Sequence, residues 1–290
     1  MIYYFSGTGN SLYVARQLAD ALGEQLCPIA PLLFTRGGGR LSDANLPSIE
    51  GGGGGGSVGL VFPVHAWGIP NVVEQFVRNL SHSPKGGAGR GLYLYTVMTC
   101  GDDMGYADEI LEKALGRKLD AAFSVQMPNT YVCLPGFDVD SDEACKEKYV
   151  QEEIAVKEIA ACVSERRRVR RLKRGTFPWT KTYIIRPLFN RYLLTDKYFN
   201  VDALRCVSCG RCRKSCPVGN IILASPQPSP KGKGLKSLPL GGDLEEAIPH
   251  WQSHCAGCLA CYHACPYHAI NFGRMTQKKG QYNLLRQLGG

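Results

Sequence analysis

The chain has 290 residues, of which 44% are hydrophobic and 20% are charged, which is typical of a folded globular protein rather than a disordered one. This length accommodates two domains, one of them with a sizeable core. No apolar run is long enough to cross a bilayer, and the N-terminus lacks the basic region and cleavage site of a signal peptide. We therefore expect a cytoplasmic protein without a membrane span.

The N-terminal half alternates between strand and helix patterns. Residues 2–5 are apolar and β-prone, and after a short loop the apolar residues of 12–22 recur at helical spacing. Strands that alternate with helices indicate a doubly wound parallel sheet covered on both faces. The further strands are predicted at Ser57–Phe62, at Gly91–Thr99 and, as a fifth strand, at Ala121–Met127, and the further helices at Pro70–Leu80 and Tyr106–Leu115.

The first domain is predicted to cover residues 1–174 and to end in one long helix over Glu143–Arg174. A connector follows at 175–199; it is rich in aromatic side chains, too apolar for a free linker, and we expect it to pack between the domains. The second domain is predicted over 200–275, with a tail at 276–290.

Two segments have biased composition. Gly51–Gly56 is an uninterrupted glycine run, and residues 225–242 are rich in proline, serine, glycine and lysine. Neither segment has the composition to bury a core, so we interpret both as surface excursions. The second is a low-complexity insertion within the second domain.

The loop after the first strand reads Ser6-Gly7-Thr8-Gly9-Asn10-Ser11. Its glycines let the backbone approach an anion closely, and its hydroxyl and amide side chains can donate hydrogen bonds near a helix start. Because the loop has no lysine, it suits a phosphate monoester held by hydrogen bonds. It lacks the third glycine of a dinucleotide fingerprint and the Gly-Lys-Ser/Thr of a P-loop.

Eight of the thirteen cysteines form two copies of the run Cys-x-x-Cys-x-x-Cys-x-x-x-Cys-Pro. This spacing predicts two [4Fe–4S] clusters, in which three closely spaced thiolates hold one cluster and the fourth ligates the other. Zinc ribbons instead separate cysteine pairs by long gaps, which disfavours zinc. The predicted ligand sets are Cys206, Cys209, Cys212 and Cys265 for one cluster, and Cys255, Cys258, Cys261 and Cys216 for the other.

The other cysteines are predicted to be buried or incidental thiols, because they show no metal-binding spacing. They are Cys27, Cys100, Cys133, Cys145 and Cys162.

The formal net charge is +9, and seven basic residues lie within nine positions of the chain. They could form a solvated helix end, a docking patch for an acidic redox partner, or a contact with nucleic acid. Nucleic acid is the least favoured, because no aromatic residues interleave the run and each oxidised cluster would add a charge of about −2. The residues are Arg166, Arg167, Arg168, Arg170, Arg171, Lys173 and Arg174.

The loop over residues 6–11 resembles the phosphate loop of flavodoxins, which bind FMN. The resemblance implies a sheet of order 2-1-3-4-5 with the flavin at the carboxyl ends of its strands. It also implies that the loops after the third and fourth strands flank the flavin ring. Trp67 is then the first candidate to stack on the ring and Tyr106 the second; the less favoured alternative is that Trp67 is a core or surface aromatic. The further residues that the resemblance implies at the flavin are Pro63, His65, Gly68, Thr99, Cys100 and Gly101.

Together the two motifs resemble the flavodoxin–ferredoxin fusion family of anaerobic bacteria. That family implies an α/β flavodoxin-like domain followed by a small α+β two-cluster ferredoxin domain. It also implies electron transfer between FMN and the clusters, with unidentified redox partner proteins as donor and acceptor. Two alternatives stay open: an FMN-dependent oxidoreductase that reduces a small acceptor with electrons from the clusters, and a redox-responsive nucleic-acid-binding protein that uses Arg166–Arg174.

Overall fold

The structure is a computed structural model of the whole chain, and it describes residues 1–34, 56–82, 92–224 and 247–284. The glycine run, except Gly56, and the predicted insertion at 225–242 lie outside these residues. Among the helices that the structure describes, none is long and apolar enough to cross a membrane.

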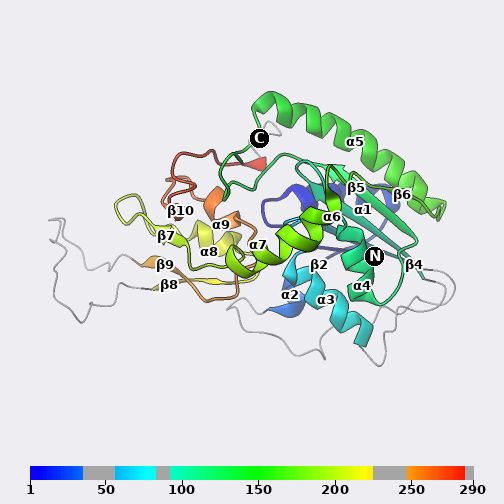
Figure 1. Cartoon of the computed structure of the whole chain (residues 1–290), viewed down its shortest axis with the longest axis horizontal. Coiled ribbons are helices and arrows are strands. Elements are labelled where there is room, and N and C mark those ends of the chain that lie inside the picture. The colour runs from blue at the N-terminus through cyan, green and yellow to red at the C-terminus, as the bar shows by residue number, and fades with distance from the viewer. Residues whose placement is uncertain (35–55, 83–91, 225–246, 285–290) are drawn as a thin grey trace.

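A six-stranded parallel sheet forms the centre of the N-terminal domain, in the order β2-β1-β3-β4-β5-β6 (Figure 1). The predicted order of five strands is therefore incomplete, because a sixth strand extends the sheet beyond β5. The sequence also left the second strand unlocated. The strands are β1 (Ile2–Tyr4), β2 (Leu26–Pro28), β3 (Ser57–Pro63), β4 (Tyr93–Cys100), β5 (Ala121–Gln126) and β6 (Arg170–Arg171).

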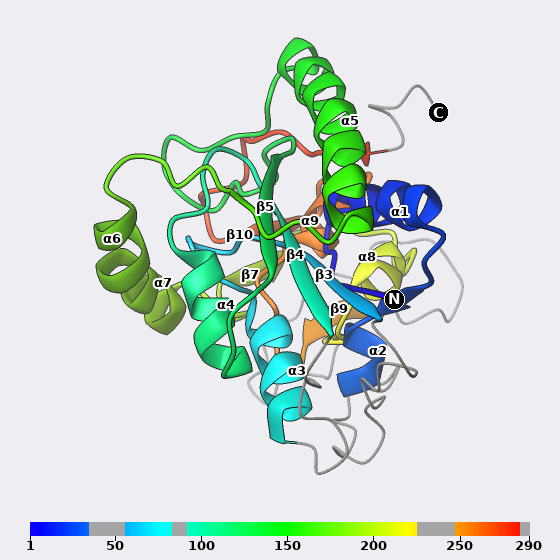
Figure 2. The same cartoon turned by 90° about the vertical axis from the view of Figure 1, so that its right-hand side faces the viewer.

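Helices cover both faces of this sheet (Figure 2). Side chains along each strand alternate between the two faces, so Leu60 packs on the α3–α4 side while its neighbour Val61 packs on the α1–α5 side. This two-sided burial explains why the strands read as continuous apolar runs. The helices are α1 (Asn10–Leu22), α2 (Ala30–Leu33), α3 (Asn71–His82), α4 (Ala107–Leu115) and α5 (Asp142–Ser164).

The prediction of one helix over Glu143–Arg174 is wrong. Helix α5 ends at Ser164, and Arg166 takes a left-handed backbone conformation (φ 51°) that turns the chain back toward the sheet. The segment then pairs with β5 as β6. The reason is electrostatic: the reversal brings the guanidinium groups of Arg170 and Arg174 to 3.0 and 2.9 Å from Asp108 on α4, a carboxylate that is 0% exposed.

The same ion pairs give part of the basic run at 166–174 a structural role. Arg170 also contacts Glu112, and both carboxylates are buried, so these arginines serve the fold. The run is not a solvated helix end, and much of its charge is balanced inside the domain. The remaining pairs are Arg167 with Glu165, Arg168 with Asp120, Arg171 with Glu158, and Arg174 with Glu109.

The connector forms a continuous helical segment against the N-terminal domain. It comprises α6 (Pro178–Thr180), a π-helix η2 (Lys181–Ile185) and α7 (Arg186–Tyr192). The buried Thr182 hydroxyl accepts a hydrogen bond from the Tyr106 amide (3.0 Å) and donates one to the Trp67 carbonyl (3.1 Å). The connector thus holds the loops that follow β3 and β4.

The C-terminal region is small and has mixed secondary structure. It contains two antiparallel strand pairs and two short helices, and it lies beside the sheet at one end of the molecule (Figure 1). Its elements are β7 (Phe199–Val201), α8 (Arg211–Ser215), β8 (Ile221–Ala224), β9 (Ile248–Trp251), α9 (Ala260–His263) and β10 (Ile270–Phe272), where β7 pairs with β10 and β8 with β9.

One buried acid makes the stability of the N-terminal domain depend on pH. Glu152 on α5 is 1% exposed, and both of its carboxylate oxygens accept from the Gln17 amide, at 2.8 and 3.0 Å. Burial raises the pKa of Glu152 to about 7. Because this pKa lies above the unfolded value of about 4.3, its contribution to stability is present at low pH and is lost as pH rises through 7.

We therefore expect Glu152→Gln to stabilise the domain more at pH 8 than at pH 5, by about 2 kcal/mol. Urea unfolding of the reconstituted protein at both pH values measures this difference. Glu153→Gln is the matched control, since Glu153 is the exposed neighbour on the same helix and pairs with Lys157. A Glu152→Gln effect that is the same at both pH values would contradict the assignment of Glu152 as a buried acid.

Candidate functional site

The loop over residues 6–11 lies between β1 and α1, at the carboxyl end of a central strand. The Gly9 amide donates to Ser6 Oγ (3.2 Å), and Gly9 has a left-handed backbone (φ 104°) that suits glycine. Gly9 also caps α1 without a side-chain hydrogen bond. The first amides of this 13-residue helix are therefore free of a side-chain acceptor, which makes this end suitable for an anion.

The polar side chains of the loop divide into two groups. Asn10 Nδ2 donates to the Pro128 carbonyl (3.0 Å), and Ser11 Oγ shares a hydrogen bond with Thr99 Oγ1 (2.7 Å), so these side chains tie the loop to the end of β4 and to the segment after β5. Thr8 has only a long contact of 3.5 Å to Thr130 Oγ1. An anion would thus meet backbone amides and the hydroxyls of Ser6 and Thr8, rather than all four side chains.

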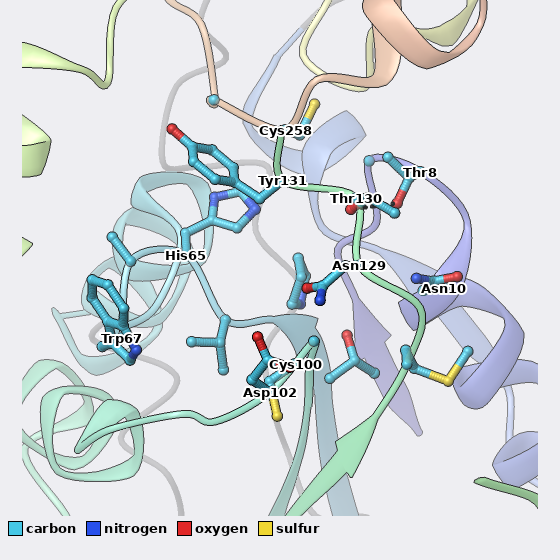
Figure 3. Close-up of a pocket in the computed structure, with 18 of the residues that line it drawn as sticks. Thr8, Asn10, His65, Trp67, Cys100, Asp102, Asn129, Thr130, Tyr131 and Cys258 are labelled. Carbon is cyan, nitrogen blue, oxygen red and sulfur yellow. Dashed lines mark hydrogen bonds between the residues drawn. The ribbon is translucent and has the colours of Figure 1, made fainter. Parts of the chain in front are cut away.

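A cavity of about 320 Å³ opens next to this loop, a volume within the range of small-molecule sites (Figure 3). The predicted flavin residues gather in its wall, with the exceptions of Gly9 and Gly68. Tyr106 is also outside the lining; it stacks on Tyr183 instead. The predicted residues that line the cavity are Ser6, Gly7, Thr8, Asn10, Ser11, Pro63, His65, Trp67, Thr99, Cys100 and Gly101.

Further lining residues come from parts of the chain that the sequence did not connect with this site. The segment after β5 could have been found, because it also leaves the carboxyl end of a parallel strand. Nothing in the local sequence of the connector or of the second cysteine loop indicates that its residues line this cavity. The additional lining includes 127–131, Leu134 and Phe137 after β5, Lys181, Phe189 and Leu194 of the connector region, and Gly257 and Cys258 of the second cysteine run.

The turn at His65–Gly68 presents Trp67 to the cavity. His65 and Gly68 exchange two backbone hydrogen bonds (2.9 and 3.1 Å), and the two residues between them, Ala66 and Trp67, both have positive φ (46° and 56°). Residues other than glycine rarely adopt this left-handed backbone conformation, so surrounding contacts must hold the turn in place. The Lys181 ammonium lies 5.5 Å from the centre of the Trp67 ring and pairs with Asp103 at 2.6 Å.

His65 points into the cavity between Trp67 and Tyr131 (Figure 3). Burial, assisted by the charge of nearby Arg186, lowers the pKa of His65 to about 4, although a hydrogen bond to the Ala256 backbone acts in the opposite direction. The imidazole is therefore neutral at neutral pH. It connects the wall of the cavity to the second cysteine loop.

The two cysteine loops share one backbone geometry. Within each triplet, the residues on either side of the middle cysteine have positive φ: Ser208 and Gly210 in the first loop, Gly257 and Leu259 in the second. The third residue after each fourth cysteine does the same, Gly219 and His268. Left-handed residues placed in this way turn successive amides toward one concavity, which favours a bound anionic group such as a thiolate-ligated cluster.

The thiols assemble in two mixed sets. A small cavity is lined by three cysteines of the first run together with Cys265. Burial, followed by the charges of Cys265, Cys206 and Cys209, raises the pKa of Cys212 to about 11. In the other set, burial and then the thiols of Cys258, Cys255 and Cys216 raise the pKa of Cys261.

This donor chemistry fits iron–sulfur clusters. All thirteen cysteines are free of disulfides, and no three His, Cys, Asp or Glu side chains in the described part of the chain converge as they would around a single metal ion. Backbone amides donate to Cys216 Sγ (3.2 Å), Cys255 Sγ (3.3 Å) and Cys265 Sγ (3.3 Å). Because burial disfavours thiolates, a cationic iron centre would be needed to hold them deprotonated.

The second cysteine loop lies directly against the loop after β1. A Cβ atom added to Gly7 would lie 2.5 Å from Cβ of Cys258 and 3.0 Å from its Sγ. Only a residue without a side chain fits at this position. Gly7 therefore allows the predicted phosphate loop and a predicted cluster ligand to share one wall of the cavity.

His263 on α9 fastens the two domains next to this contact. Its Nε2 donates to the Thr130 carbonyl (2.7 Å), and its Nδ1 accepts from the Tyr282 amide (3.0 Å), which requires the neutral imidazole. The Tyr282 hydroxyl then donates to Asn10 Oδ1 at the start of α1. The chain after residue 275 thus returns to the N-terminal domain.

A buried polar network holds the second cysteine run in place. Asp196 Oδ2 accepts from Asn220 Nδ2 (3.0 Å) and from the Ser253 amide (2.8 Å). Asn220 Oδ1 accepts from the amides of Gln252 and His254, at 3.1 and 3.0 Å. Asn220 lies four residues after Cys216, and its amide donates to Cys216 Sγ. The same residue therefore contacts Cys216 of the first cysteine run and the segment that leads into the second run.

Residues 205–270 match the family model of the 4Fe-4S dicluster domain. No curated protein matches the chain. The match supports the prediction of iron–sulfur clusters, and the C-terminal region is a ferredoxin-type domain with an electron-transfer role. The N-terminal region is an α/β domain with a parallel sheet.

We expect Asn220→Ala to destabilise the dicluster domain by about 1–3 kcal/mol, because the His254 amide loses its acceptor and the Asp196 carboxylate and the Gln252 amide each lose one of their two hydrogen bonds. The iron content after anaerobic reconstitution should fall below that of the wild type, and the thermal unfolding midpoint should drop. Asn200→Ala, an exposed asparagine of the same domain, is the control. Equal behaviour of the two variants would contradict the network's role.

Proposed function

We propose that this protein is an electron carrier that holds FMN in the cavity and two [4Fe–4S] clusters in the dicluster domain. The single observation that carries the proposal is that Gly7 of the glycine- and hydroxyl-rich loop and Cys258 of the second cysteine run line one cavity in contact with each other. A shared wall suits a function that needs two redox centres side by side in one chain.

The N-terminal site fits FMN. The first turn of α1 and the amides of residues 6–8 would hold the phosphate, with hydroxyls from Ser6 and Thr8. Trp67 and Tyr131 would flank the ring, and the neutral His65 would contact it without adding a positive charge. When bound, FMN would supply a centre that exchanges electrons singly or in pairs, whereas each cluster exchanges one at a time.

The thiols would hold the clusters crosswise. Cys206, Cys209, Cys212 and Cys265 would ligate the cluster farther from the cavity, which we call the outer set. Cys255, Cys258, Cys261 and Cys216 form the inner set, next to the cavity. The amide donors to the sulfurs and the degree of burial would then set the two potentials separately.

A second candidate is an FMN-dependent oxidoreductase that reduces a small acceptor. The observation in its favour is the mixed lining of the cavity: the apolar side chains of Leu134 and Phe137 after β5 and of Phe189 on α7 lie in its wall, together with the polar pair Lys181 and Asp103. An apolar cavity with a few polar groups is typical of small-molecule sites. Steady-state turnover of NAD(P)H with quinones or nitro-compounds separates the candidates, since a carrier shows no such turnover.

Anaerobic reconstitution should give about eight irons and one FMN per chain. A spectroscopic redox titration of that protein should then resolve a flavin and two clusters. A yellow protein without cluster signals, or an iron protein that never binds FMN, would contradict the proposed function.

Gly7→Ala should weaken FMN binding at least tenfold, because the added methyl group would meet Cys258 at 2.5 Å and displace the loop. Fluorescence titration with FMN measures the change, and the iron content should stay at the wild-type value. Gly23→Ala at the end of α1 is the control: an added methyl there meets nothing within 4 Å, so the strain of its left-handed backbone (φ 64°) should lower stability and leave the FMN affinity at the wild-type value. Unchanged FMN affinity in Gly7→Ala would show that the close approach of these loops is unimportant.

A further inference from the structure

The two cysteine loops have the same backbone geometry but different charge. Residues 205–214 of the first loop include Arg205, Arg211, Arg213 and Lys214. Residues 255–265 of the second loop contain no lysine, arginine, aspartate or glutamate. Since cluster ligation needs only the cysteines and the turns between them, this difference has another cause.

The second loop faces inward. Gly257 and Cys258 line the cavity, and Ala256 and Cys261 are buried. Charged side chains in this loop would be desolvated against the N-terminal domain, which would be costly. The absence of charge here therefore follows from packing.

The first loop faces outward and exposes two apolar side chains among its basic ones. Leu204 is 91% exposed and Val207 is 55% exposed, and Cys209 of the outer set is itself exposed. Exposed apolar side chains next to a redox centre are typical of a surface that another protein covers.

The positive charge of this loop is available to a partner. Within the part of the chain that the structure describes, Arg213 and Lys214 are exposed and form no ion pair, and Arg205 has only an exposed pair with Asp202 at 3.4 Å. Arg170 and Arg174 of the basic run are different, because they pair with the buried Asp108. The first cysteine loop is therefore a better candidate for a docking surface than the run Arg166–Arg174.

We propose that the surface formed by Leu204, Arg205, Val207, Cys209, Arg213 and Lys214, the first-loop surface, docks an acidic electron-carrier protein. The proposal rests on the proposed function, because it requires a cluster in the outer set. The cations would attract carboxylates and raise the encounter rate, and the exposed apolar side chains would exclude water around the exposed ligand on docking. Were the outer cluster bound, one electron would pass between it and the partner's redox centre, so that one protein would be oxidised as the other is reduced.

The partner's chemistry follows from what the surface offers. The surface has three cations and two apolar side chains on one short stretch of chain, residues 204–214, and so small a surface suits the transient complexes of electron carriers better than a permanent interface. A carrier rich in aspartate and glutamate complements that charge. Nucleic acid and anionic membranes would also respond to the charge, so both are included in the test.

The test compares two double charge reversals in the reconstituted full chain. Arg213→Glu/Lys214→Glu changes the first-loop surface, and Lys146→Glu/Arg166→Glu makes the same change in net charge at exposed sites on α5 and after it. The probe is a dithionite-reduced bacterial 2[4Fe–4S] ferredoxin rich in acidic residues, mixed with the oxidised protein in a stopped-flow instrument. Iron content and direct reduction by dithionite are recorded for each variant.

We expect the second-order rate constant of the wild type to fall as salt increases. Arg213→Glu/Lys214→Glu should lower it at least tenfold at low salt, while the control stays within about twofold of the wild type. Equal losses in both variants, or a rate independent of salt, would overturn the first-loop surface as the docking site.

Two further outcomes would also overturn the proposal. One is retention by duplex DNA or by phosphatidylglycerol vesicles that depends on Arg213 and Lys214, combined with no effect of these residues on the ferredoxin reaction. The other is a wild-type chain without clusters, which would contradict the proposed function itself. Iron content distinguishes this second outcome from a failure of docking alone.

Discussion

The contact between Gly7 and Cys258 is the constraint on which the arrangement of the two domains depends. A side chain at residue 7 would overlap Cys258, so the backbone of the first loop and the second cysteine loop can meet only if one of them is glycine. The same loop must also leave the amides at the start of α1 free for an anion. One short loop therefore serves the cavity on one side and the dicluster domain on the other.

The rest of the chain stabilises this contact from several directions. The connector holds the turn at Trp67 through Thr182, and His263 ties the dicluster domain to Thr130 and to the returning chain at Tyr282. The bond from Thr182 to Trp67 and the bond from His263 to Thr130 join residues that are 115 and 133 positions apart in the chain. Such contacts limit the movement of the cysteine loop relative to the cavity, which is what a fixed separation of two redox centres requires.

The sequence predicted the parts of the fold that depend on local pattern. The strands at 57–62 and 121–127 and the helix at 106–115 agree with the structure to within a few residues, because their periodicity and turns are local. The two mixed thiol sets follow from spacing alone. The sequence did not predict the end of α5, because the basic residues that follow Ser164 are compatible with a continued helix. The residue that decides their conformation, the buried Asp108 on α4, is distant in sequence. Cavity residues such as Phe189 and Cys258 were missed for the same reason.

The proposed function places a flavin and the inner cluster on either side of one cavity wall in the same chain. The most direct test is the rate at which electrons redistribute between them after photoreduction of the reconstituted protein, measured over a tenfold range of protein concentration. A first-order rate constant that does not change with protein concentration is the predicted result, since the centres are held together by the fold. A rate that rises in proportion to concentration would mean that electrons pass only between separate molecules and would contradict the account.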